Sequence, residues 1–140
     1  MPDDLDLRLR TAKALGWVLD GPAVEQNGIR IEMYRRDWDD PCFFVQYRDD
    51  AIIGCSYMPD YPASLGACAE VLEEMDARSW EYESWSGIEK GVRRHWFHIM
   101  RRDENNERAW VAEAWADSRT AAICLAFCQA VEASGNGSAG

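Results

Sequence analysis

Residues 93–115, RRHWFHIMRRDENNERAWVAEAW, carry the clearest topological signal in the chain. The runs 93–101 and 108–115 are rich in apolar and aromatic residues, and the polar segment 103–107 separates them. This pattern predicts two antiparallel strands joined as a hairpin. A further strand is expected to begin near Trp80. Since hairpins rather than crossovers join these strands, the sequence predicts an antiparallel sheet.

Three segments have the apolar spacing of helices. The first runs from Asp3 or Asp4 to Gly16, the second begins at Pro62, and the third spans residues 119–133. Together with the hairpin, they predict an α+β fold, an αβα sandwich in which three helices pack on one mainly antiparallel sheet of about four to five strands. We expect a single domain over residues 1–133 and a flexible Gly- and Ser-rich tail over residues 134–140.

The strands before the second helix are less sharply marked. Residues 29–34 alternate apolar and polar side chains, which is typical of a strand with one buried face, and Asn27-Gly28 marks a turn before it. Residues 42–47 are mostly apolar and suit a strand buried on both faces. Residues 51–55 fit either a strand or a packed loop.

Composition excludes several classes of protein. The chain has 140 residues with 47% apolar residues and 7 Trp, 5 Tyr and 4 Phe, which is too apolar for a disordered chain. Its formal net charge of −10 disfavours general nucleic-acid binding, which depends on neutralising phosphates. The acidic start of the sequence is the opposite of a secretion signal, and no apolar run is long enough to span a membrane. We therefore expect a cytoplasmic protein with free thiols.

No pattern in the sequence indicates metal or catalytic chemistry. His95 and His98 are three residues apart in a predicted strand, so they point to opposite faces, and Cys124 and Cys128 do not form a Cys-x-x-Cys pair. The chain also lacks a nucleophile elbow and a phosphate-binding loop. We predict no cofactor, no metal site and no catalytic residue. An enzyme that uses one of the two histidines as a base remains an alternative.

Arginine doublets lie near the ends of predicted strands. The interpretation we favour is that they pair with the surplus acids at the surface, while Trp80, Trp96, Trp110 and Trp115 fill the core. The alternative is a pocket in which guanidinium groups and aromatic rings hold a nucleotide. The candidate ligand-binding residues are Arg35, Arg36, Tyr61, Arg93, Arg94, Arg101 and Arg102.

Three further segments resemble one known family. They are RTAKALGW (10–17), MPDYPAS (58–64) with the helix that follows it, and ADSRTAAICLA (116–126). They resemble the opening helix, the tyrosine turn and the closing helix of the phage ABA sandwich domain proteins, which are small accessory proteins of tailed phages and prophages. The family's Ser-Thr-Asp after the tyrosine is replaced here by Pro-Ala-Ser, and residues 35–56 are longer and more aromatic than its pattern. The resemblance implies an αβα fold and an accessory role in the cytoplasm of an infected bacterial host, without catalytic residues to carry over.

The resemblance and the lack of catalytic motifs lead to a prediction of function. We expect an accessory protein that interferes with a host protein or an antiviral defence system by direct binding. One alternative is a protein that sequesters a signalling nucleotide, acting as an oligomer, and another is a small enzyme acting on a nucleotide. The candidate partner-binding residues belong to the acidic segment between residues 37 and 50: Trp38, Asp39, Asp40, Asp49 and Asp50.

Overall fold

The computed structural model describes residues 2–37, 39 and 41–133. Trp38, Asp40 and the predicted tail over residues 134–140 therefore lie outside the described residues. Three helices and antiparallel sheets confirm the α+β class. The strands form two sheets, of five and three strands, where the sequence predicted one sheet. The chain divides into two compact units, Met1–Pro59 and Asp60–Gly140. The single domain over residues 1–133 stays a prediction.

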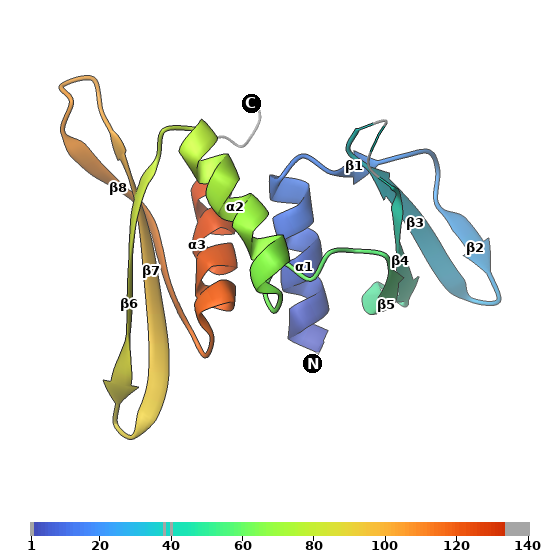
Figure 1. The fold of residues 1–140 in the computed structure, drawn as a ribbon. Helices are drawn as coiled ribbons and strands as arrows, with labels where there is room; N and C mark the ends of the chain where they lie inside the picture. The colour runs from blue at the N-terminus through green and yellow to red at the C-terminus, as the bar shows by residue number, and fades with distance from the viewer. Residues whose placement is uncertain (1, 38, 40, 134–140) are drawn as a thin grey trace. The chain divides into compact units, whose positions relative to one another are not determined.

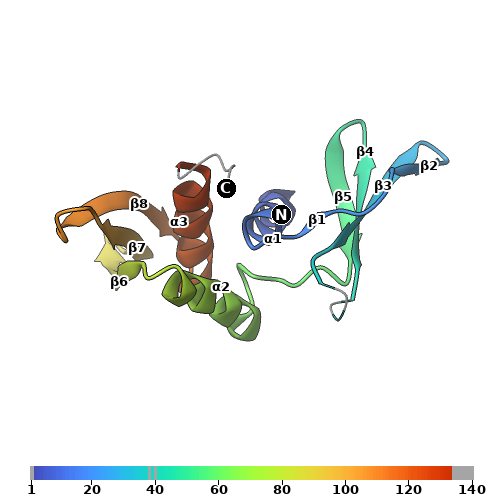
Figure 2. The ribbon, with the colours of Figure 1, turned by 90° about the horizontal axis from the view of Figure 1, so that it is seen from above.

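The first unit combines one helix with the five-stranded sheet (Figures 1 and 2). The sheet has the order β1-β3-β4-β5, and β2 pairs with β3. Asn27 and Gly28, with φ of 55° and 79°, make the turn between β2 and β3, which confirms the predicted turn. The elements are α1 (Pro2–Ala14), β1 (Val18–Leu19), β2 (Val24–Gln26), β3 (Ile29–Arg35), β4 (Phe43–Arg48) and β5 (Ala51–Ser56).

Aromatic rings form the core of the first unit. Phe43 is fully buried, and its ring centroid lies 4.8 Å from that of Trp17 and 5.1 Å from that of Tyr34. Along β4, Phe43 and Val45 are buried while Phe44 is half-buried, so this strand buries one face rather than the two predicted. Burial raises the pKa of the Tyr34 phenol above its ordinary range, and a hydrogen bond to Glu32 adds to the effect.

The second unit contains two helices and the three-stranded sheet. Its elements are α2 (Leu65–Ala77), β6 (Glu81–Glu89), β7 (Val92–Arg102), β8 (Arg108–Ala116) and α3 (Arg119–Ala133). The sheet has the order β6-β7-β8 with antiparallel pairs, which confirms the predicted hairpin. Helix α2 begins after Ser64, whose Oγ accepts a hydrogen bond from the Ala67 backbone N at 3.2 Å, so its start lies later than the predicted Pro62.

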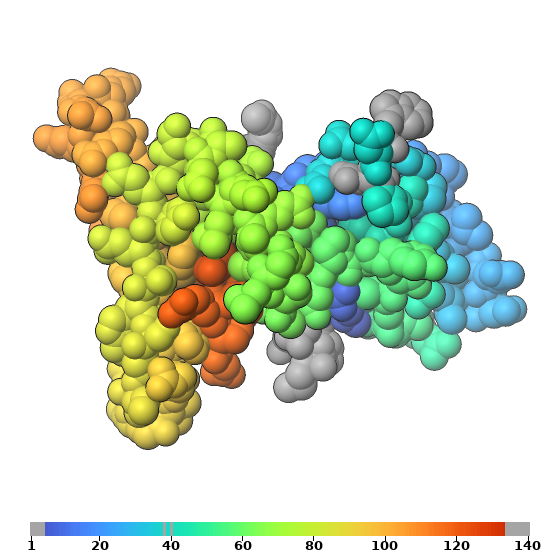
Figure 3. All heavy atoms as spheres, viewed as in Figure 1, coloured from blue at the N-terminus to red at the C-terminus, as the bar shows by residue number. Residues whose placement is uncertain are grey.

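Helix α3 packs on one face of the three-stranded sheet (Figure 1). Phe97 and Ile99 of β7 are buried on that side, and Phe127 of α3 is fully buried, 6.3 Å from the ring of Trp80. The 11 residues of β7 extend over about 36 Å, whereas the 15 residues of α3 extend over about 22 Å. The two hairpin ends of this sheet therefore extend beyond its helices, as Figure 3 shows.

Candidate functional site

One face of the three-stranded sheet is not covered by any described element of its unit (Figures 1 and 2). Because side chains alternate along β7, Phe97 and Ile99 face α3 whereas Trp96 and His98 face the opposite way. The cross-strand register assigns the residues of β6 and β8 to the same two faces. We call the uncovered surface the tryptophan face. It is formed by Glu81, Glu83, Trp85, Gly87, Arg94, Trp96, His98, Met100, Arg102, Arg108, Trp110, Glu113 and Trp115.

Three tryptophans form a row across this face. Trp85 of β6, Trp96 of β7 and Trp115 of β8 lie directly opposite one another in the register. The ring centroids of Trp85 and Trp115 are 5.8 Å apart in an edge contact, although β7 separates their strands by about 9.6 Å. Trp85 is 47% exposed and Trp115 is 43% exposed. The row is therefore an apolar band open to solvent, which is typical of binding surfaces.

Gly87 is what allows the Trp85 indole to lie along the sheet. A Cβ atom built on Gly87 would stand 2.4 Å from Cζ2 and 2.5 Å from Cη2 of Trp85. These distances are far below the separation of about 3.5–4.0 Å at which two carbon atoms are in contact. The indole thus occupies the space that a side chain at position 87 would fill.

A β-bulge brings a fourth tryptophan to the same face. Ile99 pairs with Ala112 while Met100 pairs with Trp110, so β8 carries Val111 as an extra residue between the two pairs. Without the bulge, alternation from Trp115 would turn Trp110 toward α3. With it, Trp110 lies on the tryptophan face and is 63% exposed.

His98 lies at the centre of the face and is only 6% exposed. The Trp110 ring stacks on it with centroids 3.9 Å apart and planes at 13°, and the Trp96 ring lies 4.7 Å away. Neither ring nitrogen of His98 has a hydrogen-bond partner among the described residues. Contacts with two indoles therefore hold this ring: Trp110 is stacked on it, and Trp96 lies against it at a tilt of 44°.

Two carboxylates flank His98 from the neighbouring strands. Glu83 of β6 and Glu113 of β8 are its direct cross-strand partners. The Oε1 atom of Glu83 lies 3.8 Å from His98 Nδ1, and the Oε1 atom of Glu113 accepts a hydrogen bond from Trp96 Nε1 at 2.8 Å. No cation of the described residues lies within ion-pair distance of Glu113. The centre of the face is thus aromatic and acidic.

Arginines bind the carboxylate at the end of the face nearest the β7–β8 loop. Glu81 is 2.8 Å from Nε of Arg102 and 3.0 Å from Nε of Arg108. The hydrogen bond from Arg102 holds the pKa of the Glu81 carboxyl below its ordinary value. Because both arginines are already engaged, this end offers no free excess of positive charge among the described residues.

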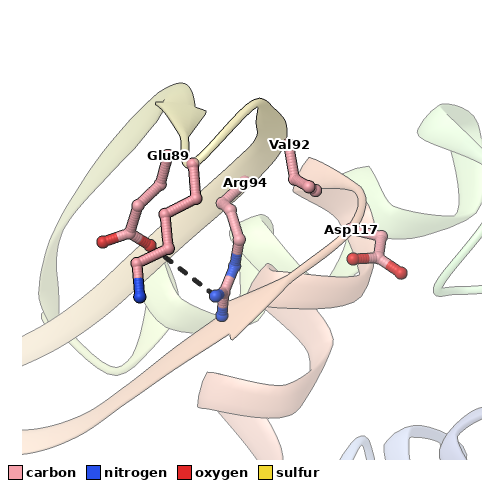
Figure 4. A pocket seen from close by; sticks show the side chains of 5 residues that line it. Glu89, Val92, Arg94 and Asp117 are labelled. Atoms are coloured by element: carbon pink, nitrogen blue, oxygen red, sulfur yellow. Dashed lines mark ion pairs between the residues drawn. The ribbon is translucent and has the colours of Figure 1, made fainter.

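A pocket of about 370 Å³ lies beside the other end of the face (Figure 4). Its lining consists of Glu89, Lys90, Val92, Arg94 and Asp117. Figure 4 shows the ion pair between Arg94 and Glu89, in which Nη1 and Oε1 are 3.7 Å apart. The two cations of the lining are matched by two carboxylates. A phosphate entering the pocket would meet like charges beside each favourable one.

Within the second unit, the structure does not bring the two predicted arginine doublets of β7 together. Arg94 and Arg102 lie on the tryptophan face, eight residues apart on β7, which corresponds to about 26 Å along the strand. Their neighbours Arg93 and Arg101 are exposed and, by alternation, face the opposite way. Within this unit the four guanidinium groups therefore do not converge on one ligand.

The remaining predicted ligand-binding residues have other surroundings. Arg35 and Arg36 belong to the first unit, where Nε of Arg35 lies 2.8 Å from Asp20 and the Arg36 guanidinium lies 4.8 Å from the centroid of Trp17. Tyr61 is fully buried, so its ring is not presented at the surface.

Three of the acidic residues predicted to bind a partner, Asp39, Asp49 and Asp50, are described, and they lie in two turns of the first unit. Asp39 is exposed. Asp49 and Asp50 make the β4–β5 turn with φ of 52° and 69°, and they border a hollow of about 290 Å³. An Oδ1 atom of Asp50 lies 3.5 Å from Nη1 of Arg30, whose guanidinium lies over the Tyr47 ring at 4.4 Å.

The interpretation of the tryptophans as core residues is correct for Trp80 and wrong for Trp110 and Trp115. Trp80 is buried against α3, whereas the other two are largely exposed on the tryptophan face. One signal for this surface is present in the sequence, because residues 96–99 are apolar or aromatic on both faces of a strand. The location of the bulge has no such signal.

The two histidines point to opposite faces, as predicted. His95 lies on the side opposite the tryptophan face, where its Nδ1 atom is 2.6 Å from the Oγ atom of Ser86. No described carboxylate contacts this histidine to orient it as a catalytic base would require.

Comparison with known proteins identified no relative: no family model, no curated protein and no solved structure matches the chain. The resemblance to the phage ABA sandwich domain proteins therefore rests on its three sequence segments and stays a prediction. Among the described residues, no helix has the length and apolar character needed to cross a membrane. The same residues contain no group of three or more His, Cys, Asp or Glu side chains arranged to hold a metal ion.

Proposed function

We propose that this chain is an accessory binding protein that acts by docking its tryptophan face on another protein. The observation that supports this function is the Trp85–Trp96–Trp115 row with Trp110 beside it, on a sheet face that no described element of its unit covers. Tryptophan supplies a large contact area with few rotatable bonds, and it is enriched among the residues that dominate binding energy at interfaces.

The sequence resemblance suggests where the partner is to be found. If the chain is an accessory protein of a phage, the partner is a host protein or a component of an antiviral defence system in the infected bacterium. The proposal involves no reaction, because its supporting observation is an apolar and acidic surface rather than an arrangement of nucleophile and base.

Affinity capture with matched variants tests the proposal. The immobilised wild-type chain, a Trp85→Ser/Trp115→Ser variant and a Leu65→Ser variant would each be incubated with lysate of phage-infected bacteria. Leu65 is the control because it is an exposed apolar residue of the same unit that lies outside the tryptophan face. Bound proteins would be quantified by mass spectrometry, and circular dichroism would confirm that each variant folds.

We expect at least one protein to be retained by the wild type and by Leu65→Ser. Its captured amount should fall about tenfold or more with the double variant, since loss of two central aromatic contacts costs more than about 1.4 kcal/mol. Equal capture by all three proteins would refute a role for the face.

A further inference from the structure

We propose that the tryptophan face receives an arginine side chain of its partner, with the guanidinium stacked on Trp110 and paired with the carboxylate of Glu113. This inference rests on the proposed function and goes beyond it, because it specifies the chemistry of the partner. It depends on the arrangement of Trp110, His98 and Glu113, and on how this chain already holds its own arginines.

Among the contacts of the described residues, three arginines are each held by an aromatic ring together with a carboxylate. The Arg94 guanidinium lies 5.3 Å from the centroid of Trp115 and 3.7 Å from Glu89. In the second case, the Arg78 guanidinium lies 5.0 Å from the centroid of Trp80, and its Nε atom is 2.8 Å from Oε2 of Glu74. In the third case, the Arg30 guanidinium lies over the ring of Tyr47 and forms an ion pair with Asp50. In each case the π-face attracts the planar cation and the carboxylate accepts its N–H groups.

Trp110 and Glu113 form a ring and carboxylate pair of the same kind without a resident arginine among the described residues. Trp110 is stacked on His98 through one indole face, and with 63% of the residue exposed its other face is open to a ligand. Glu113 is the cross-strand partner of the same His98. Both groups therefore border the same histidine, and in the proposed complex a single guanidinium contacts both.

The buried histidine is an independent indication that the centre of this face is a binding site. His98 is more than nine-tenths buried, and both of its ring nitrogens lack a hydrogen-bond partner among the described residues. A buried polar ring without partners costs free energy, and such rings are uncommon in native proteins, so each one calls for an explanation. Here it supports the indole on which the guanidinium would stack.

Charge favours a cationic partner over a second copy of the chain. If two copies packed face to face about a twofold axis through His98, the row Glu83–His98–Glu113 of one copy would lie against the same row of the other. Four carboxylates would then meet across sheets about 10 Å apart. Two chains of net charge −10 would also repel each other. An arginine supplies the opposite charge and a planar group that fits the indole.

Titration with two peptides of equal charge tests the inference. Hexa-arginine amide and hexa-lysine amide would each be titrated by calorimetry into the full-length wild type, Trp110→Leu, Glu113→Gln and the control Glu73→Gln. Glu73 is an exposed carboxylate of α2, so its variant makes the same change in net charge away from the face. Trp110→Leu and Glu113→Gln alter exposed side chains, and far-ultraviolet circular dichroism checks their folding.

We expect the wild type to bind hexa-arginine at least about threefold more tightly than hexa-lysine. Trp110→Leu and Glu113→Gln should each weaken the binding of hexa-arginine about five- to tenfold, since the first removes the cation–π contact and the second the charge-assisted hydrogen bonds. Glu73→Gln should change its affinity less than twofold. Equal affinity for the two peptides, no binding of either, or an equal effect of Glu113→Gln and Glu73→Gln would overturn the inference.

Failure of the arginine site can be distinguished from failure of the docking function. A partner whose capture is lost in Trp85→Ser/Trp115→Ser but unchanged in Glu113→Gln leaves the docking face in place and refutes the arginine site. Sedimentation equilibrium tests whether the face binds a second copy of the chain. A wild type that is a dimer, together with a Trp110→Leu variant that is a monomer, would assign the face to a second copy and refute an arginine-bearing partner.

Discussion

Replacing Gly87 by alanine tests the geometry of the tryptophan row. The added methyl carbon would stand 2.4 Å from Cζ2 of Trp85, whereas carbon atoms in contact prefer about 3.5–4.0 Å. The indole must therefore move by about 1–1.5 Å. Because Trp85 is 47% exposed, it can turn into solvent, and we expect the ring to move while the backbone of β6 stays in place.

Two opposing contributions determine how Gly87→Ala changes the free energy of unfolding. Alanine is more favourable than glycine inside a strand by about 0.5–1 kcal/mol, while loss of the edge contact between Trp85 and Trp115 costs about 0.5–1.5 kcal/mol. The net change should lie within about 1 kcal/mol. Stability alone therefore does not report the movement. The exciton couplet that two coupled indoles produce in far-ultraviolet circular dichroism should decrease.

A double-mutant cycle supplies the control. In a Trp85→Ala background the same Gly87→Ala change meets no indole, so it should stabilise the protein by about 0.5–1 kcal/mol in urea unfolding. If Gly87→Ala stabilises the wild type by the same amount and leaves the couplet intact, the Trp85 indole does not lie over Gly87 and the reasoning is refuted.

Three further predictions concern stability and ionisation in the second unit. Phe127→Ala should lower the free energy of unfolding by about 3–5 kcal/mol in urea titration, since this ring of α3 is fully buried and lies 6.3 Å from the ring of Trp80. A loss below about 1 kcal/mol would contradict its role in the core. Ser64→Ala should cost about 1 kcal/mol by removing the cap of α2, and an unchanged urea midpoint would show that the cap is dispensable. Arg102→Gln should raise the pKa of Glu81 in an NMR titration toward its ordinary value, because the Arg102 hydrogen bond is what lowers it. The stabilisation from the Arg102–Glu81 pair is present above the pKa that the carboxyl has in the unfolded chain, and it is lost as the pH falls through its lowered pKa in the folded protein. If the pKa of Glu81 does not change in the variant, the hydrogen bond from Arg102 is not the cause of the lowered pKa.

Local signals in the sequence predicted most of the elements. Helix α3 spans Arg119–Ala133, the range expected from its apolar spacing. The hairpin of β7 and β8 forms around the polar segment 103–107. Gly16, at which the first helix was expected to end, follows α1 in the left-handed region with φ of 104°. These features depend on residues within a few positions of each other.

The candidate site was predicted less completely. The arginine doublets were selected as charged groups near strand ends, and within the second unit the structure spreads Arg94 and Arg102 along β7 instead of gathering them at one place. The tryptophans were assigned to the core because apolar residues are usually buried. That assumption fails where α3 covers a single face of a sheet that is apolar on both.

By itself, the sequence determined the class of the fold, its antiparallel hairpins, its three helices and its acidic balance, because hydrophobic period, turn residues and charge are local properties. Only the tertiary structure decided that the strands divide between two sheets, that α3 covers one face of the second sheet, and that the bulge at Val111 turns Trp110 outward. These features follow from pairing and packing between residues that are distant in the sequence. A one-residue shift in register moves a side chain to the opposite face of a sheet. The binding surface proposed here depends on such a shift.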